Sequence, residues 1–383
     1  MKRNGKEKFA QVFRAAAALA GAVAFLFMYP TLGPVLESLL GQATLFSAAL
    51  TMPEGAAVTL QERFAAEIIP IDQVDQPPDD PPESSLPPPS SASSGGHQPG
   101  DGLPETDYDP EDIPEEHRGA LIAQTVTGEE GNEAFVRWQD AWVRNYTRLT
   151  PQEILAVLDD PASLTLGDSG QPQVLLYHTH TTESYDPSPG GIYDTRNNWR
   201  DVDKNNNMAA VGDTLARELE ARGINVIHDT TLHDHPSYNG AYDRSRVTVQ
   251  DYLDRYPSIK VAIDIHRDAV IYDDMSVLKP VVEVDGKNAA QLMIIAPCDD
   301  GSIGVPRWKE NFRFAAELVS GIEQKAPGLT RPIFFCYRNY NLGMTDGSLL
   351  FEFGTNGNTL AESIYTARLI APVLADYINQ HTK

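Results

Sequence analysis

The sequence predicts an α/β protein in which a mostly parallel sheet is covered by helices on both faces. Two observations support this prediction. From residue 171 to the C-terminus, short apolar runs alternate with longer segments whose apolar residues recur at helical spacing. Such alternation is typical of parallel sheets, because a crossover helix returns the chain to the same end of the sheet. Polar, chemistry-bearing residues also follow several of the apolar runs.

Local patterns place the individual elements. The helix expected over residues 207–222 has four apolar residues on one face, and Gly223 follows its last turn. The pair Asp285-Gly286 predicts a hairpin turn between residues 281–284 and 292–296. The expected strands are 174–177, 225–228, 260–265, 281–284, 292–296, 332–337 and 348–353, and the expected helices are 207–222, 245–256, 307–324 and 359–378.

The first part of the chain predicts a membrane anchor. Residues 1–14 form a basic tail, and residues 15–36 carry no charge. A spanning helix needs about 20 apolar residues, and flanking basic residues stay in the cytoplasm. We therefore expect a single-pass anchor over 15–36 with a cytoplasmic N-terminus, and a membrane-proximal segment over 37–70. A cleaved signal peptide, with the same order of charges, is the alternative. Either interpretation places the rest of the chain outside the cytoplasm.

Residues 71–118 predict a disordered linker. Residues 71–117 contain thirteen acidic residues, eleven prolines and no lysine or arginine. Such a segment cannot bury enough apolar surface to fold, and its like charges keep it extended. Residues 119–170 predict a helical lead-in, because residues 135–142 carry apolar side chains at helical spacing. The string Thr150-Pro-Gln-Glu153 matches a capping box.

Charge and cysteine content exclude some functions. The formal net charge of -24 argues against nucleic-acid binding, which requires a basic surface. The two cysteines, Cys298 and Cys336, have no metal-site spacing. They could form one disulfide in an oxidising compartment or remain two structural thiols.

Three short motifs in the region 171–383 predict one metal site in a catalytic domain. They are His178-Thr-His180-Thr-Thr-Glu183, Asp264-Ile-His266-Arg267-Asp268 and Phe351-Glu352-Phe353-Gly354. The first two follow expected strands and the third lies within one. All three should therefore meet at one edge of the sheet, where open α/β sheets bind ligands. A polar loop without a metal is the alternative interpretation of the first motif.

The residue types in these motifs point to zinc. Two imidazoles and one carboxylate, with a fourth position left open, form a recurring ligand set for catalytic Zn²⁺. We expect His180, Glu183 and His266 to be the ligands. In extended backbone His178 would point the same way as His180, which makes it an alternative ligand or a partner of a ligand.

Glu352 is the predicted general base. It lies between two phenylalanines in an apolar strand, where an unpaired carboxylate would cost several kcal/mol. Burial raises the pKa of such a group towards the range in which it can accept a proton from activated water. An ion pair with Arg338 is the alternative.

Other charged residues are expected to support the site. A ligating histidine usually donates its second N–H to a carboxylate, so Asp264 or Asp268 should contact His266. Arg267 would point elsewhere, to a carboxylate of the substrate or to Asp264. Arg244 could bind a carboxylate with two parallel hydrogen bonds.

The motifs resemble the stage II sporulation protein P family, the membrane-anchored peptidoglycan hydrolases of endospore-forming bacteria. The resemblance covers Gln173 to the C-terminus and rests on the strings 178–185, 264–269 and 352–356. The family is related to the zinc-dependent N-acetylmuramoyl-L-alanine amidases. The resemblance thus implies an amidase-like fold, Zn²⁺ as cofactor, and cleavage of the amide between muramic acid and the stem peptide, with peptide cross-links as further substrates. As partners it implies peptidoglycan, the membrane, and stage II sporulation proteins D and M.

The resemblance also implies roles for single residues. The amidase histidine ligands fall on His180 and His266, and the catalytic glutamate falls on Glu352. The usual ligand glutamate at the start of the first long helix has no counterpart, since that region reads Asp203-Lys-Asn-Asn-Asn207. Glu183 would then be the third ligand, with Asp203 less favoured. A zinc carboxypeptidase or deacetylase of the wall, and a non-catalytic wall-binding scaffold, are the alternative functions.

Overall fold

The computed structural model describes residues 110–160, 164–167, 170–188 and 190–382. The basic tail, the membrane span, the membrane-proximal segment and most of the linker expected from the sequence lie outside these ranges. Among the helices of the described ranges, none combines the length and the apolar character that crossing a membrane requires.

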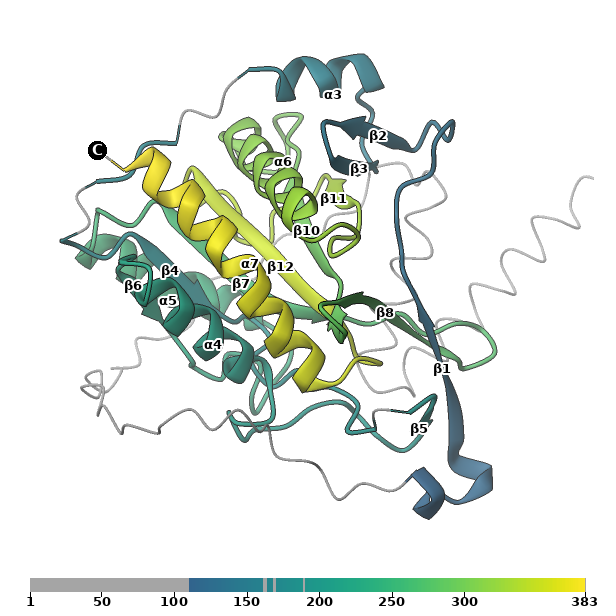
Figure 1. Cartoon of the computed structure of the whole chain (residues 1–383). Coiled ribbons are helices and arrows are strands. Elements are labelled where there is room, and N and C mark those ends of the chain that lie inside the picture. Colours follow the sequence, from purple (N-terminus) through teal and green to yellow (C-terminus); the bar gives the residue numbers. More distant parts are fainter. Residues whose placement is uncertain (1–109, 161–163, 168–169, 189, 383) are drawn as a thin grey trace, which may run out of the picture. The chain divides into compact units, whose positions relative to one another are not determined.

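The main sheet has eight strands in the order β2-β3-β11-β10-β12-β7-β4-β6 (Figure 1). In that order they are Phe135–Trp138, Ala141–Asn145, Ile333–Cys336, Leu292–Pro297, Gly347–Thr355, Val261–Asp268, Val174–Tyr177 and Val226–His228. Neighbouring strands run parallel except at the pairs β2–β3 and β10–β12. The predicted mostly parallel sheet is confirmed.

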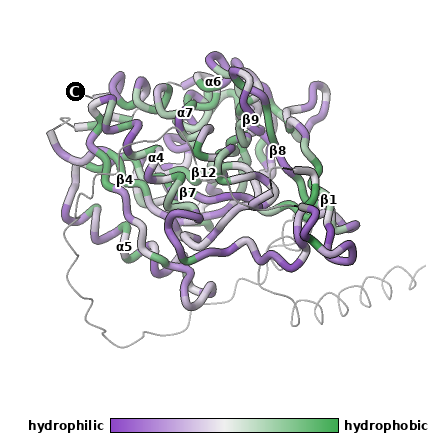
Figure 2. Tube along the Cα trace, turned by 60° about the horizontal axis from the view of Figure 1, so that its bottom comes forward, coloured by the Kyte–Doolittle hydropathy of each residue, from purple (hydrophilic) through white to green (hydrophobic). Residues whose placement is uncertain are grey.

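Helices cover both faces of this sheet, as predicted. One face packs on α4 (Met208–Glu220), α6 (Trp308–Lys325) and α7 (Leu360–His381), and their apolar side chains form one core with those of β4, β7 and β12. Figure 1 shows α7 running lengthwise beside β12, and in Figure 2 β7 and β12 run through the mainly apolar interior. The other face carries α5 (Ala241–Arg255), whose Val249 packs on alternate residues of β4.

Side-chain caps explain where two of these helices begin. The Asn207 side chain accepts a hydrogen bond from the backbone N–H of Ala209 at the start of α4. Thr359 and Glu362 form a reciprocal capping box at the start of α7. All four helices expected after residue 171 are present, with ends shifted by a few residues.

A second sheet has four strands in the order β5-β1-β8-β9. They are Ile192–Asp194, Arg118–Gln124, Val277–Val284 and Lys287–Ala290. The predicted turn Asp285-Gly286 joins β8 to β9, and both residues have the positive φ values, 49° and 74°, that a tight hairpin turn needs. The partner strand was predicted wrongly, because residues 292–297 form β10 in the main sheet.

The helical lead-in predicted over residues 119–170 is wrong in its first part, which forms strands. Residues 135–145 form the hairpin β2–β3, in which Ala141 and Val143 are buried and the residue between them is not. Apolar, aromatic and β-branched residues at this spacing also fit a strand, and β11 supplies the neighbour on which β3 pairs. The capping box at Thr150 is confirmed, and it starts the short helix α3 (Pro151–Leu158).

Order extends further toward the N-terminus than predicted. Residues 110–112 and 115–117, assigned to the linker from composition, form single 3₁₀ turns. Ile113 between them is only 3% exposed, and Arg118 donates a hydrogen bond to its carbonyl at 2.8 Å. The burial of Ile113 and this hydrogen bond tie the acidic segment to the rest of the fold.

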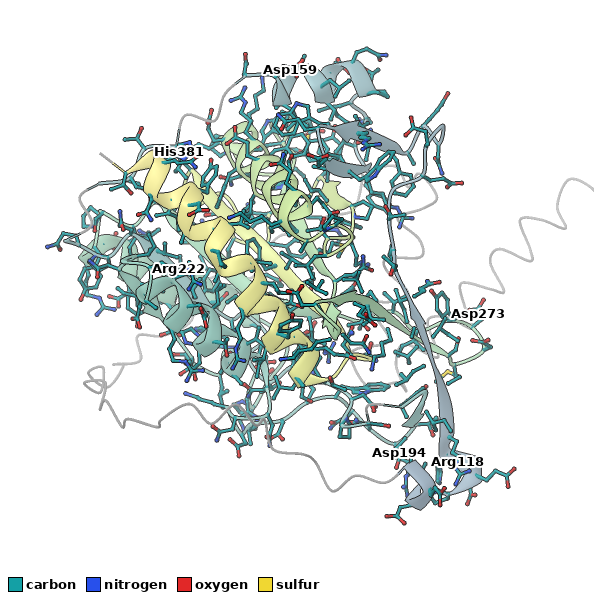
Figure 3. All side chains as sticks on the ribbon, in the orientation of Figure 1. Arg118, Asp159, Asp194, Arg222, Asp273 and His381 are labelled. Carbon is teal, nitrogen blue, oxygen red and sulfur yellow. The ribbon has the colours of Figure 1, made fainter. Side chains whose placement is uncertain are left out.

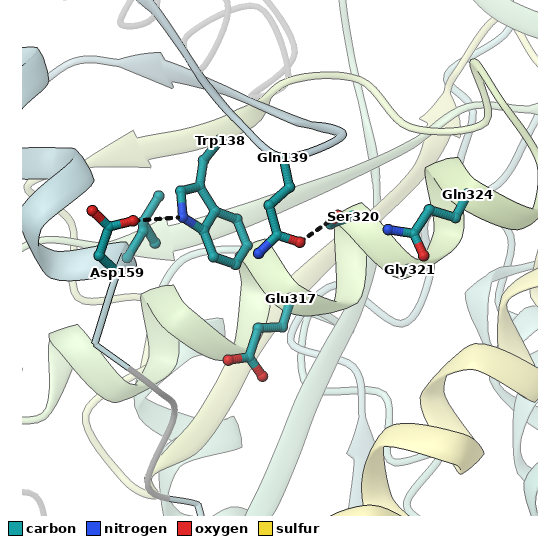
Figure 4. Close-up of a pocket in the computed structure, with 8 residues that line it drawn as sticks. Trp138, Gln139, Asp159, Glu317, Ser320, Gly321 and Gln324 are labelled. Atoms are coloured by element: carbon teal, nitrogen blue, oxygen red, sulfur yellow. Dashed lines mark hydrogen bonds between the residues drawn. The ribbon is translucent and has the colours of Figure 1, made fainter.

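A cavity of about 470 Å³ lies between the β2–β3 hairpin, the end of α3 and α6 (Figure 4). In its wall the Trp138 indole N–H donates to Asp159 at 3.2 Å, and the Ser320 hydroxyl donates to Gln139 at 3.4 Å. No residue of the three sequence motifs lines it, so this cavity is separate from the predicted site.

The two cysteines are buried at the ends of β10 and β11 and are not joined by a disulfide. The backbone N–H of Cys298 donates to the carbonyl of Cys336 at 2.8 Å. Of the two alternatives, the structure therefore has the pair of thiols.

Candidate functional site

The second and third motifs lie side by side on the central strands β7 and β12. The register of this parallel pair places Glu352 next to His266, and Leu350 next to Asp264. Residues in register on parallel strands point to the same face, and alternate residues of one strand share it. Tyr177 of β4 pairs with Asp264 and packs towards α5. The side chains of Asp264, His266 and Glu352 therefore face the α5 side of the sheet.

The first motif joins them through a turn. After His178 the chain leaves β4, and the N–H of Glu183 donates to the carbonyl of His180 at 3.1 Å. Asp264 stabilises this turn, because its carboxylate accepts hydrogen bonds from the Thr179 N–H at 2.8 Å and from the Thr179 hydroxyl at 2.6 Å. The extended backbone assumed for the first motif is thus wrong beyond the end of β4.

The three predicted metal ligands are buried and adjacent. Glu183 Oε2 lies 3.5 Å from His266 Nδ1, and the rings of His180 and His266 meet edge to face at 5.2 Å. Asp264 Oδ1 lies 2.9 Å from His266 Nε2, so the carboxylate beside His266 is Asp264. Within the described ranges, His180 Nδ1 is buried without a hydrogen-bond partner.

The electrostatics put two of these groups in the protonation state that a metal ligand needs. Burial alone would raise the pKa of Glu183, but Arg267 and the neighbouring imidazoles outweigh it and hold this pKa well below its usual range. Burial lowers the pKa of His180 to about 3, so its imidazole is neutral. Burial also opposes the charged form of His266, but the carboxylates of Asp264 and Glu183 outweigh it and raise its pKa well above the usual value. A metal would have to displace that proton.

The residue types of the three predicted ligands are those that bind Zn²⁺, and the distance between two of them, Glu183 and His266, suits a shared ion. Bonds of about 2.0–2.1 Å at a tetrahedral angle put two ligand atoms roughly 3.3 Å apart, close to the 3.5 Å between Glu183 and His266. In the part of the chain that the structure describes, no three histidine, cysteine or acidic side chains already stand in a geometry that holds an ion. Binding of the ion therefore requires a side chain to move. His180 is the candidate for this movement, because its Nδ1 forms no hydrogen bond.

His178 lies apart from this group, on the side of α4. Its Nδ1 donates to the carbonyl of Ile265 at 3.0 Å, and its Nε2 lies 2.8 Å from Nε2 of His228. His228 Nδ1 is in turn 2.9 Å from Asp213. Because a carbonyl only accepts, Nδ1 of a neutral His178 carries the proton, and its Nε2 accepts a hydrogen bond from Nε2–H of His228. Both ring nitrogens of His178 are engaged on the α4 side, so turning the ring towards the site on the α5 side would break both contacts.

Gly212 of α4 makes room for this histidine pair, and we expect Gly212→Ala to destabilise the protein. A Cβ at this position would lie 2.5 Å from His228 Nε2 and 2.8 Å from His178 Nε2. In an open helix the same change stabilises by about 1 kcal/mol, but overpacking should here cost about 1–3 kcal/mol in the free energy of unfolding. Urea unfolding measures it. Adding His228→Ala should recover part of the loss, and a more stable Gly212→Ala variant would contradict the expectation.

The other predicted residues support the site in ways that the sequence did not show. Arg267 donates to the carbonyls of Ser184 and Trp199, each at 2.9 Å, and not to Asp264. Asp268 pairs with Arg331 at 2.7 Å, so it does not orient His266. The predicted contacts of Arg267 with Asp264 and of Asp268 with His266 are therefore wrong, while a contact of Arg267 with a substrate carboxylate stays a prediction.

Arg244 and Asp203 are also placed. The Arg244 guanidinium donates to three backbone carbonyls, those of His233, Ser237 and Asn239, and so fixes the loop before α5. Asp203 is exposed and accepts the N–H of Asn205 at 3.0 Å. In Figure 3 labelled charged residues such as Arg222 and Asp273 lie at the margin of the fold, in contrast to the buried charges of the site.

Two tyrosines that were not predicted from the sequence form an aromatic wall of the site. The Tyr238 ring stacks on His180 at 4.4 Å, and the Arg200 guanidinium lies over Tyr238 at 4.8 Å. Tyr242 meets the edge of His180 at 5.4 Å and lies nearly parallel to His266 at 6.3 Å. Tyr242 stands two residues before Arg244, but no sequence pattern distinguishes Tyr242 or Tyr238.

The fold and these side chains define an α/β protein with a buried cluster of imidazole and carboxylate groups on its central parallel strands. The family model described as Stage II sporulation protein P matches residues 105–375, and the chain belongs to this family. It is 31% identical over 230 residues to Stage II sporulation protein P of Bacillus subtilis (strain 168). That alignment covers 57% of this chain and 53% of the relative, so the chain spans about half the length of that curated protein.

Similar solved structures are N-acetylmuramoyl-L-alanine amidases. AmiC2 of Nostoc punctiforme has 15% sequence identity and a TM-score of 0.31, over 55% of this chain and 96% of that one. CwlD amidase from Clostridioides difficile in complex with the GerS lipoprotein has 10% identity and a TM-score of 0.33, over 54% and 99%. Ami1 from Mycobacterium smegmatis has 10% identity and a TM-score of 0.30, over 55% and 98%.

Proposed function

We propose that this protein is a Zn²⁺-dependent peptidoglycan hydrolase that cleaves the amide between N-acetylmuramic acid and L-alanine during sporulation. The observation that carries the proposal is the meeting of three distant segments. They bring His180, Glu183, His266 and Glu352 to one buried cluster on the α5 side of the sheet. The types of these residues match the needs of metal-assisted hydrolysis, and the family to which the chain belongs acts in sporulation.

In this proposal His180, Glu183 and His266 hold the ion. When bound, the ion polarises the carbonyl of the amide and lowers the pKa of water to about 7. Glu352, beside His266 on the next strand, accepts a proton from the attacking water and passes it to the leaving amine. Asp264 fixes the orientation of the His266 ring from 2.9 Å.

Residues outside the described ranges complete the proposal. Residues 15–36 would anchor the chain in the cell membrane with the N-terminus in the cytoplasm, and residues 71–118 would act as a tether. The catalytic domain would then face the wall outside the cytoplasm. Stage II sporulation proteins D and M are the proposed protein partners, and peptide cross-links are possible further substrates.

Mass spectrometry of muropeptides tests the proposal. Purified wall is digested with the detergent-solubilised full chain, with and without a chelator. We expect stem peptides with new L-alanine N-termini, their loss with the chelator, and their return on adding Zn²⁺. Release of terminal D-alanine alone would indicate a carboxypeptidase, and release of acetate would indicate a deacetylase. Binding to wall without any product would indicate a scaffold.

A further inference from the structure

Tyr242, the second residue of α5, contacts both imidazoles proposed as ligands. Its ring meets the edge of His180 at 5.4 Å with an interplanar angle of 84°. It lies nearly parallel to His266, at 6.3 Å and 12°. Tyr242 thus forms a wall of the site that faces both imidazole rings. Glu352 is the neighbour of His266 on the next strand, so it lies on this same side of the sheet.

The position of Tyr242 is fixed by its surroundings. Its backbone carbonyl accepts hydrogen bonds from the Asn341 amide at 2.8 Å and the Ser245 hydroxyl at 3.2 Å. The Tyr340 ring packs on the Tyr242 ring at 5.3 Å. Tyr340 and Asn341 have φ values of 42° and 59°, which residues other than glycine rarely adopt. Such backbone strain is concentrated at functional sites, where surrounding contacts maintain it.

The hydroxyl of Tyr242 is available as a donor. Within the described ranges, the side chains that donate hydrogen bonds to Tyr242 donate to its backbone carbonyl, and its own hydroxyl makes no hydrogen bond. The side chain is half-buried. An unperturbed phenol has a pKa of about 10, well above neutral pH. The group therefore keeps its proton in a site that is otherwise rich in acceptors.

We propose that the Tyr242 hydroxyl is a further catalytic group, which donates a hydrogen bond to the carbonyl oxygen of the scissile amide as negative charge develops there. This inference rests on the proposed function. The water oxygen bonds to the carbonyl carbon, the π pair of the carbonyl moves to its oxygen, and Glu352 accepts the water proton. The C–N bond then breaks, and the same proton goes to the leaving nitrogen. The Tyr242 O–H is not consumed.

Tyr242→Phe tests the inference, because it removes the hydroxyl and keeps both ring contacts. In the zinc-loaded full chain we expect kcat on muropeptides to fall by about 10²–10³-fold, as for loss of an oxyanion donor. KM and zinc content should stay at the wild-type values. Tyr252→Phe is the matched control, since it removes from the same helix a hydroxyl that donates to Asp229, and it should keep wild-type kcat.

A binding measurement gives a second readout. A muropeptide analogue with a tetrahedral phosphinate in place of the amide should bind Tyr242→Phe more weakly by the factor lost in kcat/KM. The stem-peptide product should bind both proteins equally. If the wild type cleaves the amide and Tyr242→Phe keeps kcat and phosphinate affinity within about threefold, the inference is wrong. Loss of zinc or of folding in this variant would show a structural role instead. A wild type that never cleaves the amide overturns the proposed function and this inference with it.

Discussion

Glu352→Gln should lower hydrolysis of the wall amide by about 10²–10⁴-fold, the usual contribution of a general base, while the protein keeps its zinc. The neutral amide is nearly isosteric with the carboxylate but cannot accept a proton from water. Glu352 is a neighbour of His266 in the sheet and is not one of the proposed ligands, so the metal should remain. Rates on purified muropeptides and zinc content by elemental analysis measure both effects.

Glu283→Gln serves as the matched control. Glu283 is an exposed residue of β8, so its variant should behave as wild type in both measurements. Normal cleavage of wall by Glu352→Gln would show that this carboxylate is not the base. Loss of zinc together with activity would instead place Glu352 among the ligands.

His266→Ala should weaken zinc binding by more than about 100-fold and abolish hydrolysis. Loss of a residue that only orients a ligand already costs 10–100-fold, and His266 Nδ1 is the atom that lies 3.5 Å from Glu183. Bound zinc stabilises the folded state by RT ln(1 + [L]/Kd), where [L] is the free zinc concentration and Kd its dissociation constant. Zinc should therefore raise the unfolding midpoint of the wild type and leave that of His266→Ala unchanged. Calorimetric titration and thermal unfolding with added Zn²⁺ measure these effects.

Two further histidine variants sharpen this test. His178→Ala should lower stability, because it breaks the contacts to Ile265 and His228, yet keep stoichiometric zinc. His117→Ala, in a turn remote from the three motifs, should change neither property. Zinc binding that survives in His266→Ala but is lost in His178→Ala would assign the ligand role to the other histidine.

Most elements after residue 171 could be predicted because their signals are local. The caps Asn207 and Thr359 and the turn Asp285-Gly286 act within a few residues, and the structure contains all three. The hairpin 135–145 was predicted as a helix because its pattern fits both structures. What decides it is pairing with β11, which lies almost 200 residues further along the chain.

In the candidate site, too, local sequence predicted some features and long-range contacts decided the others. The sequence identified His180, Glu183, His266 and Glu352, because ionisable residues beside buried strands are unusual wherever they occur. It could not choose between Asp264 and Asp268 as the partner of His266. That choice depends on Arg331, a residue of the distant loop before β11, which forms an ion pair with Asp268.

The sequence by itself determined the class of fold, the order of most strands and helices, and the residue types available for chemistry, because periodicity, caps and turns are short-range properties. Only the tertiary structure decided the side of the sheet on which each group lies. A turn after β4 separates His178 from His180, and the packing of α5 brings Tyr242 against both imidazoles. These contacts join residues far apart in the chain, and their geometry is set by strand register and helix packing, which no local pattern encodes.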